Sequence, residues 1–222
     1  MSAADDAYGQ IKKAILSLKF RPGQKLSEVR LAGQLGVGRS PIRSALARLA
    51  GEGWIRVLPQ SGTFVSELTV HDVLELAEIR WLLEPYVARL AAARISAAAL
   101  QSLRLLAEDL KEKGLKGRFA EFTELDDRIH FAIHRAGGNR RIASILRNLH
   151  DQIHWVRVST AALPGRVEKS MREMDRILRA LERRDAAAAE KAMQQHIRNI
   201  AQSFRSMPRG HRKSAAAGGE AA

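Results

Sequence analysis

The fold is decided by residues 35–50, which read Leu35-Gly36-Val37-Gly38-Arg39-Ser40-Pro41-Ile42-Arg43-Ser44-Ala45-Leu46-Ala47-Arg48-Leu49-Ala50. The two glycines predict a tight turn, and Ser40 before Pro41 predicts a helix that starts there with Ser40 as its N-cap. Apolar residues then recur at helical spacing and give the helix one buried stripe, with Arg39 and Arg43 off that stripe. This pattern is typical of the second helix of a helix-turn-helix. On its own, the stretch fits an ordinary amphipathic helix with solvated charges equally well.

The flanking sequence favours the helix-turn-helix, because it completes a winged helix. Two further helices are expected before the turn, over residues 5–19 and 27–35. After the turn and its helix, residues 54–58 and 63–65 indicate two strands joined by a turn at 59–62. Small and polar residues at the tip of this wing can approach a DNA backbone or minor groove. A hairpin that only stabilises the domain is the alternative.

From residue 69 onward the sequence indicates helices alone. Thr69 and Asp72 have the spacing of a capping box. Helices are expected over residues 71–94, 96–113, 118–136, 139–160, 166–183 and 185–205. We therefore predict a mainly α protein with a winged helix-turn-helix domain over 1–68 and an all-α antiparallel six-helix bundle over 69–205. A disordered tail is expected over 206–222.

Composition is typical of a globular protein with a polyanionic partner. The 222 residues include 37 Lys and Arg against 24 Asp and Glu, so the formal net charge is +13. Residues 1–68 hold ten basic and five acidic residues, which makes this region more basic per residue than the predicted bundle over 69–205. With no cysteine, no secretory signal and no long uncharged apolar run, we expect a cytoplasmic protein without membrane contact. We expect no enzyme activity, because no Walker loop, dinucleotide-binding glycine motif or nucleophile elbow is present.

Several short motifs resemble those of the GntR family of bacterial repressors. They are Pro22-Gly23-Gln24-Lys25-Leu26-Ser27-Glu28, the stretch 35–46, Gly53-Trp54 and Gly62-Thr63-Phe64-Val65. The predicted bundle resembles the FadR-type (FCD) effector domain of this family. The residues that carry this second resemblance are Glu78-Ile79-Arg80 with Glu84, Leu125-Asp126 with His130, Ala136-Gly137-Gly138-Asn139, and Arg184-Asp185 followed by His196-Ile197. The resemblance covers nearly the whole chain except the tail, and six bundle helices look closer to the VanR-like branch.

The resemblance implies a homodimeric transcription regulator, which we expect to be a repressor that binds a palindromic operator in double-stranded DNA. The DNA contacts that it implies are Arg39, Ser40, Arg43, Arg30 and, in the wing, Gly62. Arginine can form two hydrogen bonds to a guanine edge, and a serine at a helix N-terminus can bond a phosphate. Two positions depart from the family pattern: Gly38 stands where Ser or Thr is usual, and Ser44 where Glu is usual.

The resemblance also implies a divalent metal ion (zinc, nickel, manganese or a similar ion) inside the bundle. Asp126 and His130 are four residues apart and share a helix face, and His196 comes from the last helix. In this chain Met174 occupies the position of the family's third histidine, and a thioether is a poor ligand for such ions. Three alternatives stay open. In the first, Asp126, His130 and His196 bind the ion, and waters or the effector complete its coordination. In the second, the metal is lost and the pocket binds the effector directly. In the third, a neighbour replaces the missing histidine ligand: His134, Asp175 or the pair His150 and His154.

The resemblance implies a small-molecule effector in the bundle, and a metal ion together with an arginine would suit a small organic acid. In this family the arginine at position 80 commonly faces the effector pocket, and its planar guanidinium suits a carboxylate. Alternatively, Arg80 pairs with Glu84, four residues on. We also place Arg157 in this cavity. Two other functions remain as alternatives: a non-specific nucleic-acid-binding protein, and a metal-dependent hydrolase that lacks an evident general base.

Overall fold

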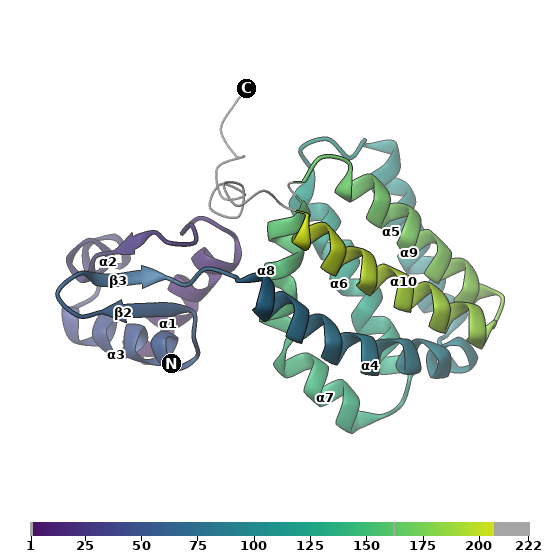
Figure 1. Cartoon of the computed structure of the whole chain (residues 1–222), viewed down its shortest axis with the longest axis horizontal. Coiled ribbons are helices and arrows are strands. Elements are labelled where there is room, and N and C mark those ends of the chain that lie inside the picture. Colours follow the sequence, from purple (N-terminus) through teal and green to yellow (C-terminus); the bar gives the residue numbers. More distant parts are fainter. Residues whose placement is uncertain (1, 162, 207–222) are drawn as a thin grey trace. The chain divides into compact units, whose positions relative to one another are not determined.

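The structure is a computed structural model that describes residues 2–161 and 163–206. The chain forms two compact units, with the boundary in the sequence between Leu68 and Thr69 (Figure 1). The described residues form ten helices and one three-stranded sheet, which confirms the predicted mainly α fold. From position 207 onward the predicted tail lies outside the described residues. No single described helix is long and apolar enough to cross a membrane; helices Val70–Arg94 and Ala97–Glu112 meet that requirement only as a pair, bent by 116°.

The N-terminal unit is a winged helix. Its helices are α1 (Ala3–Leu16), α2 (Glu28–Leu35) and α3 (Arg39–Gly51), and its strands are β1 (Lys25–Leu26), β2 (Ile55–Leu58) and β3 (Gly62–Val65). The strand order is β1-β3-β2 with antiparallel pairing throughout. Strands β2 and β3 form the predicted wing, whereas β1 was not expected, because two residues are too few to show an alternating pattern. The core of this unit includes Ile11, Ile15, Leu31, Ile42, Leu46, Leu49 and Ile55.

The turn between α2 and α3 begins as predicted but ends earlier. Gly36 terminates α2 with φ +65°, a left-handed conformation that glycine adopts without strain. Gly38 has φ −68° and ψ 167° and already serves as the N-cap, so α3 begins at Arg39. The prediction of Ser40 as N-cap was therefore wrong, and Ser40 is exposed in the first turn of α3. Helix α1 ends at Leu16, before the predicted limit of residue 19, and Leu18 beyond it has φ +58°.

The C-terminal unit is a helical bundle, with no strand among its residues 69–161 and 163–206. Its helices are α4 (Val70–Arg94), α5 (Ala97–Glu112), α6 (Phe119–Ala136), α7 (Arg140–Asn148), α8 (His150–Ala161), α9 (Arg166–Glu182) and α10 (Ala186–Arg205). Thr69 and Asp72 form the predicted capping box, and Asp185 caps α10. Helix α10 packs along α4 and α9, while α6 packs against α4, α5 and α8 (Figure 1). One continuous apolar core joins these helices.

The bundle has seven helices where six were predicted, because the expected helix 139–160 is divided in two. Helix α7 ends at Asn148 and α8 starts at His150, with Leu149 between them. No glycine or proline marks this break, so the sequence carries no local signal for it. The break lets α8 bury a broad face against the bundle, whereas α7 buries only Leu146. The six-helix count that suggested the VanR-like branch was therefore wrong.

Candidate functional site

The helix-turn-helix exposes the side chains that were predicted to contact DNA. Arg39, Ser40 and Arg43 are exposed in the first turns of α3, and Arg30 is exposed on α2. Nε of Arg43 donates to Glu28 at 2.9 Å, although the Arg43 side chain remains 69% exposed. Among the described residues, no ion pair involves Arg39 or Arg30. An exposed and unpaired guanidinium is free to bond a base edge or a phosphate.

Gly62 lies where the wing turns into β3. Its φ is +119°, and a Cβ at this position would lie 2.8 Å from Cε of Lys25. The position favours glycine for its backbone angle, whereas the flexible side chain of Lys25 could move away from a Cβ. Pairing of β1 with β3 brings Lys25 beside the wing. This position of Lys25 could not be predicted, because the pairing of β1 with β3 has no local signal in the sequence.

Asp126 and His130 of α6 and His196 of α10 come together inside the bundle, and all three are buried. Nε2 of His130 lies 3.4 Å from Nε2 of His196. The two carboxylate oxygens of Asp126 lie 3.6 Å from Nε2 of His196 and 3.9 Å from Nε2 of His130. Ligand atoms that bind one ion at about 2.0–2.2 Å are separated by about 3–4 Å. The observed spacing therefore fits a divalent ion.

Two buried carboxylates lie behind these imidazole rings. Oε2 of Glu173 is 2.8 Å from Nδ1 of His196, and Oε2 of Glu84 is 2.5 Å from Nδ1 of His130. A carboxylate behind a ligating histidine favours a proton on Nδ1 and leaves the lone pair on Nε2. The Nε2 lone pairs of His130 and His196 then lie close to the carboxylate of Asp126. Because all three groups are electron donors, a cation bound between them would stabilise the arrangement.

Glu173 of α9 is held by a network that the sequence analysis did not identify. It accepts hydrogen bonds from Arg166 at 3.0 and 3.2 Å and from Nδ2 of Asn199 at 2.7 Å. Burial raises its pKa, but the hydrogen bonds from His196 and Arg166 outweigh that effect and lower the pKa to about 2. Glu173 is therefore a carboxylate at neutral pH. The only signal in the sequence was its position beside Met174.

Met174 itself is buried in the apolar core. Of the substitutes considered for it, Asp175 pairs with Arg104 at 2.5 Å and with Arg179 at 2.7 Å. His154 lies 2.7 Å and His150 4.0 Å from Asp127, which also leaves them outside the cluster around Asp126. His134 is the remaining substitute, and it approaches Glu84.

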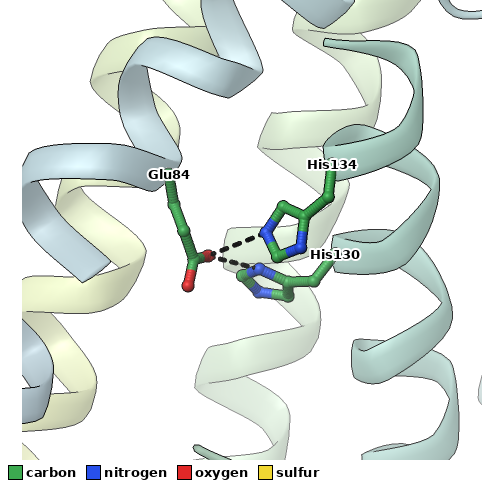
Figure 2. A group of neighbouring side chains, drawn as sticks. All are labelled: Glu84, His130 and His134. Atoms are coloured by element: carbon green, nitrogen blue, oxygen red, sulfur yellow. Dashed lines mark ion pairs between the residues drawn. The ribbon is translucent and has the colours of Figure 1, made fainter. Parts of the chain in front are cut away.

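Glu84, His130 and His134 form a second group at the other edge of the His130 ring (Figure 2). Oε2 of Glu84, from α4, lies 3.8 Å from Nε2 of His134 in addition to its contact with His130. Burial raises the pKa of Glu84, but the charge of Arg80 and the contacts with His130 outweigh it and hold the pKa well below its usual range. Burial lowers the pKa of His130 to about 4, so its ring is neutral at neutral pH.

Both arginines predicted to bind the effector are buried and paired with carboxylates. Nε of Arg80 donates to Oε1 of Glu84 at 2.7 Å, which is the ion pair weighed as an alternative. Its Nη2 is buried without a hydrogen-bond partner. Arg157 pairs with both Asp126 and Asp127. A buried N–H group without a partner is costly, so Nη2 of Arg80 is a group that a bound anion can satisfy.

Comparison with known sequences identifies both units. The sequence model of the FCD domain matches residues 75–199, and that of the gntR family of bacterial regulatory proteins matches residues 3–65. The uncharacterized HTH-type transcriptional regulator YdhC of Bacillus subtilis (strain 168) is 30% identical over 194 residues, which are 86% of this chain and 85% of YdhC. The HTH-type transcriptional repressor RspR of Escherichia coli (strain K12) is 29% identical over 198 residues, 89% and 87% of the two chains.

Solved structures share the fold. Escherichia coli McbR/YncC superposes with a TM-score of 0.72 at 22% identity, over 92% of this chain and 98% of McbR/YncC. The metal-free FCD domain of TM0439 superposes with a TM-score of 0.54 at 21% identity, over 63% of this chain and 99% of that domain. With the family matches over both units, these findings show that the chain belongs to the GntR family of bacterial DNA-binding transcription regulators and carries an FCD effector domain.

Proposed function

We propose that this regulator is a repressor that binds a palindromic operator as a homodimer and responds to a small organic acid in its FCD domain. The observation that carries the proposal is the buried cluster of Asp126, His130 and His196, together with Arg80, which Glu84 links to His130 and whose Nη2 is unsatisfied. A buried polar cluster that is incomplete without a ligand is typical of a sensing site. The exposed arginines of α3 supply the DNA-binding half of the function.

The three ligand residues suit zinc, nickel or manganese, because imidazole nitrogen and carboxylate oxygen bind all of these ions. Such an ion would supply a positive, Lewis-acidic centre for a carboxylate. Arg80 would then donate to the same carboxylate through Nη2. We therefore expect small carboxylates that chelate metals to be the effectors.

Dimer formation is supported by an apolar stripe on α4. Ile79, Leu82 and Tyr86 are exposed at the i, i+3, i+7 spacing of one helix face, and Trp81 is exposed beside this stripe. Exposed apolar side chains gathered on one helix mark an interaction surface. A second copy is the occupant we propose, because reading two half-sites of a palindrome requires two winged helices.

Catalysis is not part of the proposal. A metal-dependent hydrolase needs a free general base beside the ion. The two carboxylates nearest the candidate ligands, Glu84 and Glu173, are already held by Arg80 and Arg166. Oε2 of Glu84 faces Nδ1 of His130, and Oε2 of Glu173 faces Nδ1 of His196. Both carboxylates therefore lie on the sides of the rings turned away from the ligand cluster and are not placed to activate a water there.

A binding assay with an operator duplex and a scrambled duplex of equal length tests the DNA-binding half. We expect wild-type protein to prefer the operator, and Arg39→Ala to lose that preference while its binding stays salt-dependent. Arg128→Ala is the matched control, because Arg128 pairs with Glu124 on the surface of the bundle. Equal affinity of the wild-type protein for both duplexes would contradict the proposal and favour a non-specific nucleic-acid-binding protein.

A further inference from the structure

His130 presents its two ring nitrogens to two different sets of ligands. Nε2 faces Asp126 and His196, whereas Nδ1 faces Glu84. His134 follows His130 by one helical turn, and two histidines at this spacing on one helix face are a known zinc-binding arrangement. Figure 2 shows Glu84 directed at both rings from the neighbouring helix α4.

The second set consists of atoms that contact one another without well-aligned hydrogen bonds: Oε2 of Glu84 lies 2.5 Å from Nδ1 of His130 and 3.8 Å from Nε2 of His134. Oε2 of Glu84, Nδ1 of His130 and Nε2 of His134 are all buried, and none has a well-formed hydrogen bond. Buried polar atoms normally have hydrogen-bond partners, so a buried polar atom without one indicates a missing ligand or ion. Here three such atoms converge, and they are two imidazole nitrogens and one carboxylate oxygen, the donor set that zinc-type ions prefer. A bound ion would take the place of the proton between Oε2 of Glu84 and Nδ1 of His130, and their separation of 2.5 Å would widen to about 3–4 Å.

We propose that Glu84, His130 and His134 form a second divalent-cation site, which competes for the ring of His130 with the site of Asp126, His130 and His196. The proposal rests on the proposed function, of which the first site is a part. Its ligands are borderline divalent ions such as zinc, cobalt and nickel, which accept two imidazoles and one carboxylate.

The two sets are closely matched in chemistry. In each set one buried arginine pairs with the carboxylate: Arg80 contacts Oε1 of Glu84, and Nε of Arg157 contacts Asp126. The first set would gain a fourth protein ligand from a histidine at position 174, but this chain has a methionine there. Each set therefore offers three protein ligands, and the first has no advantage in ligand number.

Competition follows from the chemistry of a neutral imidazole, which has one lone pair and one N–H. His130 can donate a lone pair from Nε2 to the first site or from Nδ1 to the second. Filling the second site moves the ring proton from Nδ1 to Nε2, where Asp126 at 3.9 Å and His196 at 3.4 Å face it. The first site joins α6 to α10, and the second joins α6 to α4, so the position of the ion determines which helices it links.

Three single substitutions separate the sites in the full-length protein. His196→Gln removes a ligand of the first site only, His134→Gln removes a ligand of the second only, and His130→Gln removes a ligand of both. Protein stripped with a chelator is titrated with Co²⁺, and bound metal per chain is measured together with the visible absorption spectrum. We expect one ion per chain for the wild type, His196→Gln and His134→Gln, with different spectra for the two single-site variants. For His130→Gln we expect loss of binding.

The outcomes distinguish this proposal from the proposed function. If His134→Gln binds one ion and His196→Gln binds none, the second site does not exist and the first site stands. Two ions per wild-type chain would overturn the competition. Absence of binding in all four proteins would overturn both sites, while operator binding by the same samples would still test the DNA-binding half. Thermal unfolding of each metal-free variant confirms folding, and His134→Ala and His196→Ala replace any glutamine variant that does not fold.

Discussion

Replacing Glu173 by glutamine removes the negative charge on which Arg166 and His196 converge. Arg166 donates two hydrogen bonds to this carboxylate, and both side chains are buried. Removing one partner of a buried ion pair costs about 3–5 kcal/mol, because the other charge stays buried without compensation. At about 2–4 °C per kcal/mol for a chain of this size, the melting temperature should fall by about 6–20 °C.

A double-mutant cycle identifies the source of this cost. In Glu173→Gln combined with Arg166→Met no buried charge is left unpaired, so the double variant should be more stable than Glu173→Gln alone. Urea unfolding of the metal-free proteins near neutral pH measures all four corners of the cycle. A loss below about 1 kcal/mol for Glu173→Gln, or a double variant whose loss equals the sum of the two single losses, would refute the reasoning.

The same substitution should weaken metal binding at His196. Loss of the group that orients a ligating histidine typically costs about 10–100-fold in affinity. Glu182→Gln is the matched control on α9, because Glu182 pairs with Arg104 and contacts none of the candidate ligands. Titration with Zn²⁺ followed by calorimetry measures both variants, each in a His134→Gln background that removes the proposed second site. Equal affinities would show that Glu173 does not orient His196 for a metal.

Three further predictions test other features. Met174→His should add a ligand, so that an ion at 100 times its Kd stabilises this variant by about 2.7 kcal/mol; unfolding with and without Zn²⁺ measures it, and equal metal-dependent shifts in variant and wild type would contradict it. Hydrogen bonds from Arg104 lower the pKa of Asp175 against the opposing effect of burial, so its contribution to stability is present above the unfolded pKa of about 3.9 and is lost as pH falls below it. Urea unfolding from pH 6 to pH 2 should therefore show a weaker pH dependence for Asp175→Asn than for wild type. Gly137→Ala would place a Cβ 2.6 Å from Cγ1 of Val87 and 3.2 Å from its carbonyl oxygen, which should cost about 1–3 kcal/mol in thermal unfolding; unchanged stability would show that the contact relaxes freely.

The winged helix could be predicted because its signals are local. The apolar residues Ile42, Leu46 and Leu49 recur on one face of α3, and the structure buries all three. Gly36 takes the left-handed conformation that its position before the turn suggested. Strand β1 could not be predicted, since its two residues become a strand only by pairing with β3. The break at Leu149 was missed for a similar reason, because packing against other helices and no local residue type places it there.

The candidate site was less predictable, because it depends on which helix faces meet. The spacing of Asp126 and His130 predicts a shared face, but only the resemblance to a family linked them to His196. Periodicity does not show that Glu173 lies behind His196, since the two residues come from different helices. For Arg80, the ion pair with Glu84 was readable from the i,i+4 spacing, whereas its buried and unsatisfied Nη2 required the structure.

The balance of buried charge around His130 indicates when a carboxylate can bind there. Three arginines pair with four carboxylates in this region, so one negative charge is left without a balancing arginine. The arginines are Arg80, Arg157 and Arg166, and the carboxylates are Glu84, Asp126, Asp127 and Glu173. A carboxylate effector would add a second buried negative charge, and an uncompensated buried charge is costly. A divalent ion makes the net charge of this group of side chains positive instead of negative. The acid should therefore bind only when the metal is present. Chelator-treated protein should therefore bind its operator but not respond to carboxylates, and added Zn²⁺ should restore the response. An equal response without metal would refute this argument and favour direct binding of the acid by the arginines.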